Sequence, residues 1–204
     1  MTDRRDRPFQ SQQHLPPAIL PYNAIPDWIA RLPVGQLVSW RETVLGDVDV
    51  AREIWMPPAL AAAINAPKWT PVGSESHNRA DRRRRDTRAF LAGFVTGTPL
   101  QIGTGDDRCD IKCLHPVPGA PWREWELRIT PEDPHTRIFG VWGGAYRDFV
   151  AMSINAKAAI IGTQTKLGQQ ALIDYNNLTR PPLPFSFRDR PNAQSLLGSS
   201  CGYY

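Results

Sequence analysis

The stretch WREWELRITPEDPHTRIFGVWGGAYRDFVAMSINAK, residues 122–157, decides the fold, because it reads as three consecutive short strands. Apolar residues at positions 125, 127 and 129 alternate with charged residues at 124, 126 and 128, the period-2 pattern of a sheet with one buried and one exposed, charged face. A second strand, Thr136 to Trp142, follows a Pro/Asp/His turn, and Gly143-Gly144 separates it from a third at Phe149 to Ile154. The stretch therefore predicts an antiparallel meander.

The meander carries four basic residues, Arg128, Arg137, Arg147 and Lys157, which make a candidate phosphate-facing surface. The formal net charge of the chain is +4, and the whole surplus lies in residues 79–180, which hold 15 Lys and Arg against 11 Asp and Glu. This balance suits a polyanionic partner such as RNA, with an ordinary solvated surface as the alternative.

Helical patterns flank the strands. Residues 79–95 predict a helix whose second half supplies apolar residues to a core and whose first half carries six Arg against two Asp. Arginines at the start of a helix oppose its macrodipole, so they do not stabilise the helix. Two roles stay open for Arg82, Arg83, Arg84 and Arg85: they contact nucleic acid or an acidic partner, or they form a solvated helix face. Short extended pieces follow at residues 100–102 and 109–114, and residues 165–178 predict a closing helix.

The 20 prolines, which concentrate near the two ends, set the expected domain organisation. Residues 1–26 are expected to form a flexible arm, and residues 181–204 a disordered tail. Residues 27–78 predict an N-terminal extension that packs on the main domain, with helices near 27–32 and 58–66 and a strand near 36–44. Neither a signal peptide nor a membrane span is recognisable, which predicts a cytoplasmic protein without a membrane partner.

Three cysteines, an odd number, argue against a disulfide framework. Cys109 and Cys113 share one face of an expected strand, and His115 completes a Cys-x3-Cys-x-His spacing that suggests a metal site. On a strand these side chains spread over roughly 20 Å at about 3.3 Å per residue, too far for one ion. Buried free thiols and no metal are therefore expected, and no dinucleotide or P-loop motif indicates a cofactor.

The order of a helix, K-x-L at 112–114, W-E-L-R at 125–128, R-I-F-G at 137–140 and a D-F-V-A strand that ends near Lys157 resembles the RelE/HigB-like superfamily of bacterial toxin-antitoxin proteins and its phage-derived members. The resemblance covers residues 79–180. It implies an α+β fold, a helix with a twisted antiparallel sheet, and cleavage of messenger RNA, usually on the ribosome. It also implies a cognate antitoxin or another protein partner.

RelE-like ribonucleases make the 2′-hydroxyl of RNA attack the adjacent phosphate, which requires a base, cations for the developing charge and an acid, but no metal. By similarity of position, Arg137 and Lys157 correspond to basic residues that such toxins use on phosphate. Arg128 and Lys112 occupy matching places, where a structural role is the alternative. RelE itself has lysines where this chain has glutamates at 124 and 126. Glu126 is therefore a candidate base or an ion-pair partner of Arg128.

Several further candidates have two readings each. Tyr175 resembles a C-terminal catalytic tyrosine but also fits the apolar stripe of its helix, and Arg147 is either a nucleic-acid contact or a turn residue. His115 and His135 lie in Pro-rich loops, where each is either a proton donor or solvated. An RNA-cleaving enzyme and a catalytically silent binding or inhibitory protein of the same fold both stay open. The extra N-terminal residues favour the second class.

Overall fold

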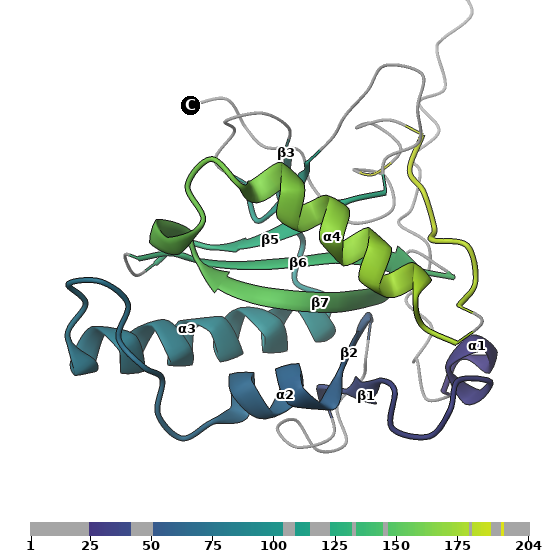
Figure 1. Ribbon diagram of the computed structural model, residues 1–204, viewed down its shortest axis with the longest axis horizontal. Coiled ribbons are helices and arrows are strands. Elements are labelled where there is room, and N and C mark those ends of the chain that lie inside the picture. The colour runs from purple at the N-terminus through teal and green to yellow at the C-terminus, as the bar shows by residue number, and fades with distance from the viewer. Residues whose placement is uncertain are drawn as a thin grey trace, which may run out of the picture.

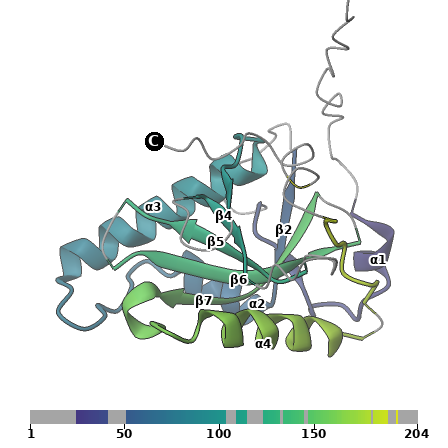
Figure 2. The ribbon, with the colours of Figure 1, turned by 90° about the horizontal axis from the view of Figure 1, so that it is seen from above.

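A computed structural model describes residues 25–41, 51–103, 109–114, 123–131, 134–144, 147–179 and 181–188, together with Ala193. Its centre is a seven-stranded sheet in the order β1-β2-β7-β6-β5-β4-β3. Helix α4 lies on one face of the sheet, and α3 and α2 lie on the other, so the described part of the chain has three layers (Figures 1 and 2). The expected α+β class is confirmed.

The elements follow the chain as α1 (Asp27–Ala30), β1 (Val38–Ser39), β2 (Glu53–Met56), α2 (Pro58–Asn65), α3 (His77–Val95), β3 (Ile102–Gly103), β4 (Ile111–Cys113), β5 (Trp125–Ile129), β6 (Thr136–Gly143), β7 (Asp148–Ala156), the 3-10 turn η2 (Lys157–Ala159) and α4 (Gln164–Asn176). Helix α3 begins two residues earlier than expected, after Ser76, whose hydroxyl accepts a hydrogen bond from the backbone N–H of Arg79 at 3.3 Å. A serine in this position satisfies one of the free amides at a helix start.

The predicted meander is confirmed, because β5 pairs with β6 and β6 with β7 in antiparallel register. Strand β4 also pairs antiparallel with β5. Two further pairings, β2 with β7 and β3 with β4, are parallel, so the sheet is mixed and not simply antiparallel. Neither pairing is a hairpin, and β2 and β7 are separated by most of the main domain, so the local hairpin signals of the sequence could not reveal them.

The residues of β6 are all buried, because both faces of this central strand are covered. The ladder with β7 shifts register between Phe139 and Gly140. A Cβ atom at Gly140 would collide with the backbone carbonyl of Val150 and the ring of Phe149, so only glycine fits at this close approach. The glycine of the R-I-F-G motif is thus explained by packing.

One face of the sheet carries the main apolar core against α3 and α2, with Leu127, Ile138 and Trp142 at its centre. The opposite face was expected to be exposed and charged. That expectation is wrong for β5, since Glu126 is only 3% exposed and α4 packs over β6 and β7 on that side. The sequence pattern could not show it, because a charged strand face reads the same whether solvent or a buried ion pair meets it.

The N-terminal extension does more than pack on the main domain, because its β2 joins the sheet beside β7. This strand was not predicted, because its four residues are all buried and lack the alternation of a half-exposed strand. Before it, Arg52 donates from Nη2 to the carbonyl of Thr98 at 2.6 Å and lies 5.0 Å from the ring centre of Phe94. Burial lowers the pKa of Arg52 to about 10.

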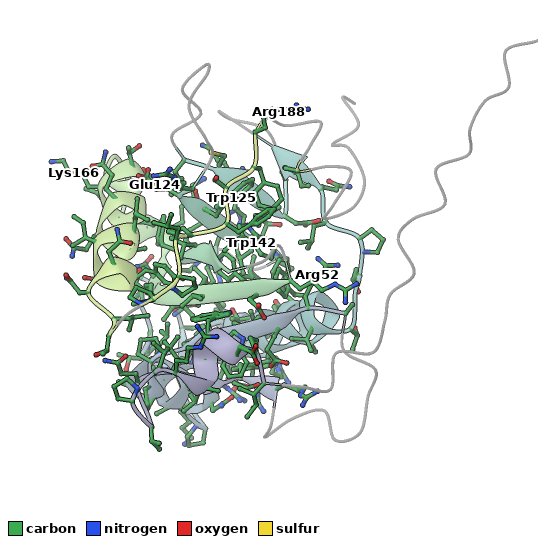
Figure 3. The ribbon with its side chains drawn as sticks, turned by 90° about the vertical axis from the view of Figure 1, so that its right-hand side faces the viewer. Arg52, Glu124, Trp125, Trp142, Lys166 and Arg188 are labelled. Atoms are coloured by element: carbon green, nitrogen blue, oxygen red, sulfur yellow. The ribbon has the colours of Figure 1, made fainter. Side chains whose placement is uncertain are left out.

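The tail predicted to begin at residue 181 is ordered over residues 181–188. The backbone N–H of Phe185 donates to the carbonyl of Trp142 at 2.7 Å, and Phe187 is fully buried with its ring centre 5.1 Å from that of Trp125. Figure 3 shows both tryptophans inside the molecule. The packing of Phe185 and Phe187 against the core orders this segment, although its proline content had predicted disorder. The rest of the tail, Ala193 apart, and residues 1–24 of the arm lie outside the described residues.

The cysteines differ from each other. Both described cysteines are buried, as expected, and Cys113 keeps its thiol, but Cys109 is disulfide-bonded. The expectation of free thiols is therefore wrong for Cys109, because spacing along one strand does not reveal a distant partner. Among the described residues, no helix is both long and apolar enough to cross a bilayer.

Candidate anion-binding site

Three of the predicted basic residues meet in one pocket of about 580 Å³, where β5 ends, β6 begins and β7 ends. Arg128, Arg137 and Lys157 line it, each from a different element of the meander or the turn that follows. The antiparallel register explains the meeting, since Arg128 is directly opposite Arg137, and Asn155, two residues before Lys157, is the other neighbour of Arg137. We refer to it as the cationic pocket.

Arg137 forms the inner wall of the cationic pocket and is 1% exposed. Its Nε lies 2.5 Å from Oε1 of Glu126, and its Nη1 donates to the carbonyl of Thr136 at 2.9 Å. Its remaining nitrogen, Nη2, is buried and has no hydrogen-bond partner among the described residues. A buried donor left unsatisfied typically costs about 1–3 kcal/mol, so this guanidinium is incompletely bonded.

The Glu126–Arg137 pair is buried beneath the pocket, and burial opposes both of its charges. Burial raises the pKa of the Glu126 carboxyl, against the opposing influence of Arg137 and of the more distant Arg128 and Lys112. Burial likewise lowers the pKa of Arg137. Lys112 lies directly across the strand from Glu126 and thus on the same face. Arg128 approaches the carboxylate at 3.9 Å, so the expected Glu126–Arg128 contact is present and secondary to that with Arg137.

Arg128 and Lys157 border the same pocket and are less buried than Arg137. The backbone N–H of Arg128 donates to the carbonyl of Asp110 at 2.8 Å, which fixes β5 against the segment before β4. The backbone N–H of Lys157 donates to the carbonyl of His135 at 2.7 Å, and this places the lysine at the start of η2 beside the start of β6. These bonds fix the two points of the main chain from which the side chains of Arg128 and Lys157 extend.

The pocket also contains residues that were not selected from the sequence: Gln101, Cys109, Asp110, Thr130 and His135. His135 had been considered only as one of two loop histidines, and the other, His115, lies outside the described residues. Asp110 is tied down, since its Oδ2 accepts from the backbone N–H of Gln101 at 2.9 Å. Thr130 and His135 lie between β5 and β6, whereas Gln101, Cys109 and Asp110 precede β3 and β4 and reach the pocket because β4 pairs with β5.

Two candidate residues lie elsewhere. Tyr175 is fully buried against α1 and the sheet, where its hydroxyl donates to the carbonyl of Pro182 at 3.0 Å, and burial raises its pKa. This burial fits the apolar-stripe reading, and Tyr175 does not line the cationic pocket. Arg147 precedes β7, whereas Lys157 follows it, so the two are about 30 Å apart along an extended strand. Arg147 is not part of this pocket.

The arginine cluster of α3 is largely committed to carboxylates. Arg83 is buried and donates from Nε and Nη2 to the two carboxylate oxygens of Glu75, each at 3.0 Å. Arg84 pairs with Asp81 at 2.8 Å, and the more exposed Arg85 lies 3.7 Å from the same aspartate. Of the two readings left open for these arginines, neither suits Arg83, whose guanidinium is buried against Glu75. The pairing of Arg83 with Glu75 could not be predicted from helix periodicity, because Glu75 lies before the first residue of α3.

Because Arg137 is buried, its loss would leave Glu126 buried with Arg128, at 3.9 Å, as its remaining ion-pair contact within the described part of the chain. Among the described residues, no group of three or more His, Cys, Asp or Glu side chains is placed to hold a metal ion. Comparison of the chain with protein-family models, curated proteins and solved structures gave no match.

Proposed function

We propose that the chain is a nucleic-acid-directed protein of the RelE/HigB-like kind, and that the cationic pocket binds a backbone phosphate of RNA. The observation that carries the proposal is the unsatisfied Nη2 of Arg137 in the wall of a pocket that also presents Arg128 and Lys157. Planar guanidinium groups match phosphate geometry, and charge-assisted hydrogen bonds to phosphate are stronger than neutral ones. A phosphate oxygen that reached Nη2 would satisfy a donor that the described protein groups leave unbonded.

The order of elements supports the resemblance over residues 79–180, since α3 is followed by the antiparallel strands β4 to β7 and then by α4. The parallel strands β2 and β3 at the margins of the sheet are additions to that pattern. A protein partner, such as an antitoxin, is part of the same proposal.

Salt-dependent binding tests the pocket. Binding of a labelled single-stranded oligoribonucleotide is measured by fluorescence anisotropy over a range of NaCl concentrations, for the wild type and for Lys157→Ala. Each phosphate contact releases condensed counterions, so losing Lys157 should weaken binding and reduce the slope of log K against log salt by about 1. The matched control is Lys166→Ala, which removes an exposed cation on the outer side of α4 (Figure 3). Equal slopes for wild type and Lys157→Ala would contradict the proposal.

A second candidate function, metal-independent cleavage of RNA, is favoured by the presence of His135 in the cationic pocket. In this reaction the 2′-oxygen bonds to the adjacent phosphorus and the bond from phosphorus to the 5′-oxygen breaks. One group takes the proton of the 2′-hydroxyl, and a proton passes to the leaving 5′-oxygen. Glu126 lies behind Arg137 and is not a pocket-lining residue, so His135 is the better candidate for proton transfer.

Mapping of RNA ends tests cleavage. The wild type should leave 2′,3′-cyclic phosphate ends, with a rate that EDTA does not change. His135→Asn should slow the reaction about 10² to 10⁴-fold, the usual contribution of a general acid or base, while leaving the affinity for RNA nearly unchanged. RNA that stays intact with folded, RNA-binding wild-type protein would assign the chain to the silent binding class.

A further inference from the structure

A second pocket of about 460 Å³ adjoins the cationic pocket along β7. Asn155 and Ala156 line the second pocket, and the next residue, Lys157, lines the first. Consecutive Cα atoms are about 3.8 Å apart. Asn155 is also the cross-strand neighbour of Arg137. The linings of the two pockets are therefore consecutive along the chain at the end of β7, with Asn155 in the second pocket directly across from Arg137 in the first.

The second pocket has an aromatic wall that is held in a fixed position. Trp69 donates from its indole nitrogen to the carbonyl of Ala63 at 2.9 Å, and the guanidinium carbon of Arg83 lies 4.9 Å from its ring centre. Arg83 is itself held by the bidentate bond to Glu75. A ring restrained on two sides loses little freedom when a ligand packs against it.

The rest of the lining suits a flat heterocycle with polar edges. Val72 and Ile154 supply apolar surface, while Thr70 and Asn155 supply hydrogen-bonding groups. The carboxamide nitrogen of Asn155 makes a long contact of 3.5 Å with the hydroxyl of Ser153, which a better acceptor can replace. Asparagine side chains pair with base edges through one donor and one acceptor.

We infer that the second pocket takes an unstacked nucleobase of single-stranded RNA, packed against Trp69, while a phosphate of the same RNA strand occupies the cationic pocket. This inference rests on the proposed function and narrows its substrate to unpaired RNA, because a base within a duplex cannot leave its stack without added cost. The wall formed by Lys68 to Val72 belongs to the N-terminal extension. The extension thus completes a site whose phosphate-binding half lies in the main domain.

An extended peptide is the rival occupant. Strand β2 pairs with β7 only through Asp148–Val150 among the described residues, so the remainder of that edge of β7 could accept another strand. Continuity with the cationic pocket favours the nucleotide, because a peptide strand requires neither an aromatic wall nor an adjacent cluster of three cations.

The test compares Trp69→Ala and Trp69→Phe with the wild type on two ligands: a single-stranded oligoribonucleotide and the same backbone with abasic positions. Loss of one base–aromatic contact typically weakens binding roughly 5- to 100-fold, so Trp69→Ala should lose that much affinity for intact RNA. Its affinity for abasic RNA should equal that of the wild type. Trp69→Phe should keep most of the affinity for intact RNA, since it retains an aromatic ring under Arg83.

The outcomes separate the two levels of the proposal. Wild-type protein that binds intact and abasic RNA equally well, with no effect of Trp69→Ala, would refute the base pocket and leave the phosphate pocket standing. Binding of neither ligand by folded wild-type protein would refute both. An extended peptide that binds at Trp69 in place of RNA would also overturn the inference. Unchanged affinity of Trp69→Ala for abasic RNA, with an unchanged urea midpoint, verifies that this variant is folded.

Discussion

Two buried arginine–glutamate pairs, one on each side of the sheet, differ in how completely they are bonded. Arg83 and Glu75 meet in a two-point contact, and Glu75 also accepts from the backbone N–H of Val72 at 3.0 Å. Arg137 and Glu126 meet through a single nitrogen, and Nη2 of Arg137 is left without a partner among the described residues. The first pair is satisfied within the protein, whereas the second retains capacity for a ligand.

The pKa values of Glu75 and Glu126 are shifted in opposite directions, in line with this difference in bonding. Burial alone would raise the pKa of Glu75, but the hydrogen bond and charge of Arg83 and the bond from Val72 hold this pKa below its ordinary value. At Glu126 burial prevails over the surrounding cations, and the pKa is raised. The two ion pairs therefore differ in completeness of bonding, although both look alike in sequence, and the less complete pair borders the candidate site.

The largest expected effect is on stability. Arg83→Ala should reduce the free energy of unfolding by about 3–5 kcal/mol, because it leaves Glu75 buried without its partner. Arg137→Ala should be less costly, since Glu126 already has a raised pKa and can take up a proton. Urea unfolding of both variants at neutral pH measures the difference. An equal or larger loss for Arg137→Ala would reverse the ranking of the two pairs.

The two pairs should respond oppositely to pH. The depressed pKa of Glu75 gives stability that is present above the unfolded-state value of about 4.3 and is lost as the pH falls through its folded pKa. The raised pKa of Glu126 gives a contribution that is lost as the pH rises from about 4.3 through its folded pKa.

Urea unfolding over a series of pH values, with Glu75→Gln and Glu126→Gln against the wild type, isolates each carboxyl. The stability of wild type relative to Glu75→Gln should decrease toward acid pH, and relative to Glu126→Gln it should decrease toward neutral pH. Curves that run parallel for the two comparisons would show that the pairs are equivalent.

Inorganic phosphate should stabilise the folded protein by an amount between those of the other predictions. A ligand that binds only the folded state stabilises it by RT ln(1 + [L]/Kd), about 2.7 kcal/mol at a hundredfold excess over Kd. The melting temperature of the wild type should rise with phosphate, and that of Lys157→Ala should rise much less. The control Lys166→Ala should respond like the wild type. A rise of the same size in all three proteins would indicate general salt effects and no site.

The smallest effect is expected in the exposed part of α3. Arg85→Ala should change the free energy of unfolding by no more than about 0.5 kcal/mol, as for most surface substitutions, because Arg85 is largely solvated and its contact with Asp81 is long, 3.7 Å. The same variant should leave the salt dependence of RNA binding unchanged. A slope reduced by about 1 would restore Arg85 to the nucleic-acid surface.

The sequence predicted what depends on local periodicity. The meander, α3 and α4 are confirmed because their patterns of 2 and 3.6 residues are continuous. It also selected Arg128, Arg137 and Lys157, which do meet in one pocket. It could not predict that β2 enters the sheet or that Phe187 completes the core, because long-range contacts decide both. Nor could it separate the buried arginines from the exposed ones.

The central claim is that Arg137, and not Arg83, is the buried arginine that binds phosphate. Side-chain nitrogen resonances of arginine report the hydrogen bonds of each guanidinium, and Arg137→Lys and Arg83→Lys assign the two signals. On titration with inorganic phosphate, the Arg137 signal should shift with a saturable dependence on phosphate, while the Arg83 signal stays in place. An Arg137 signal that does not move while phosphate saturates the protein, or movement of Arg83 alone, would contradict the account.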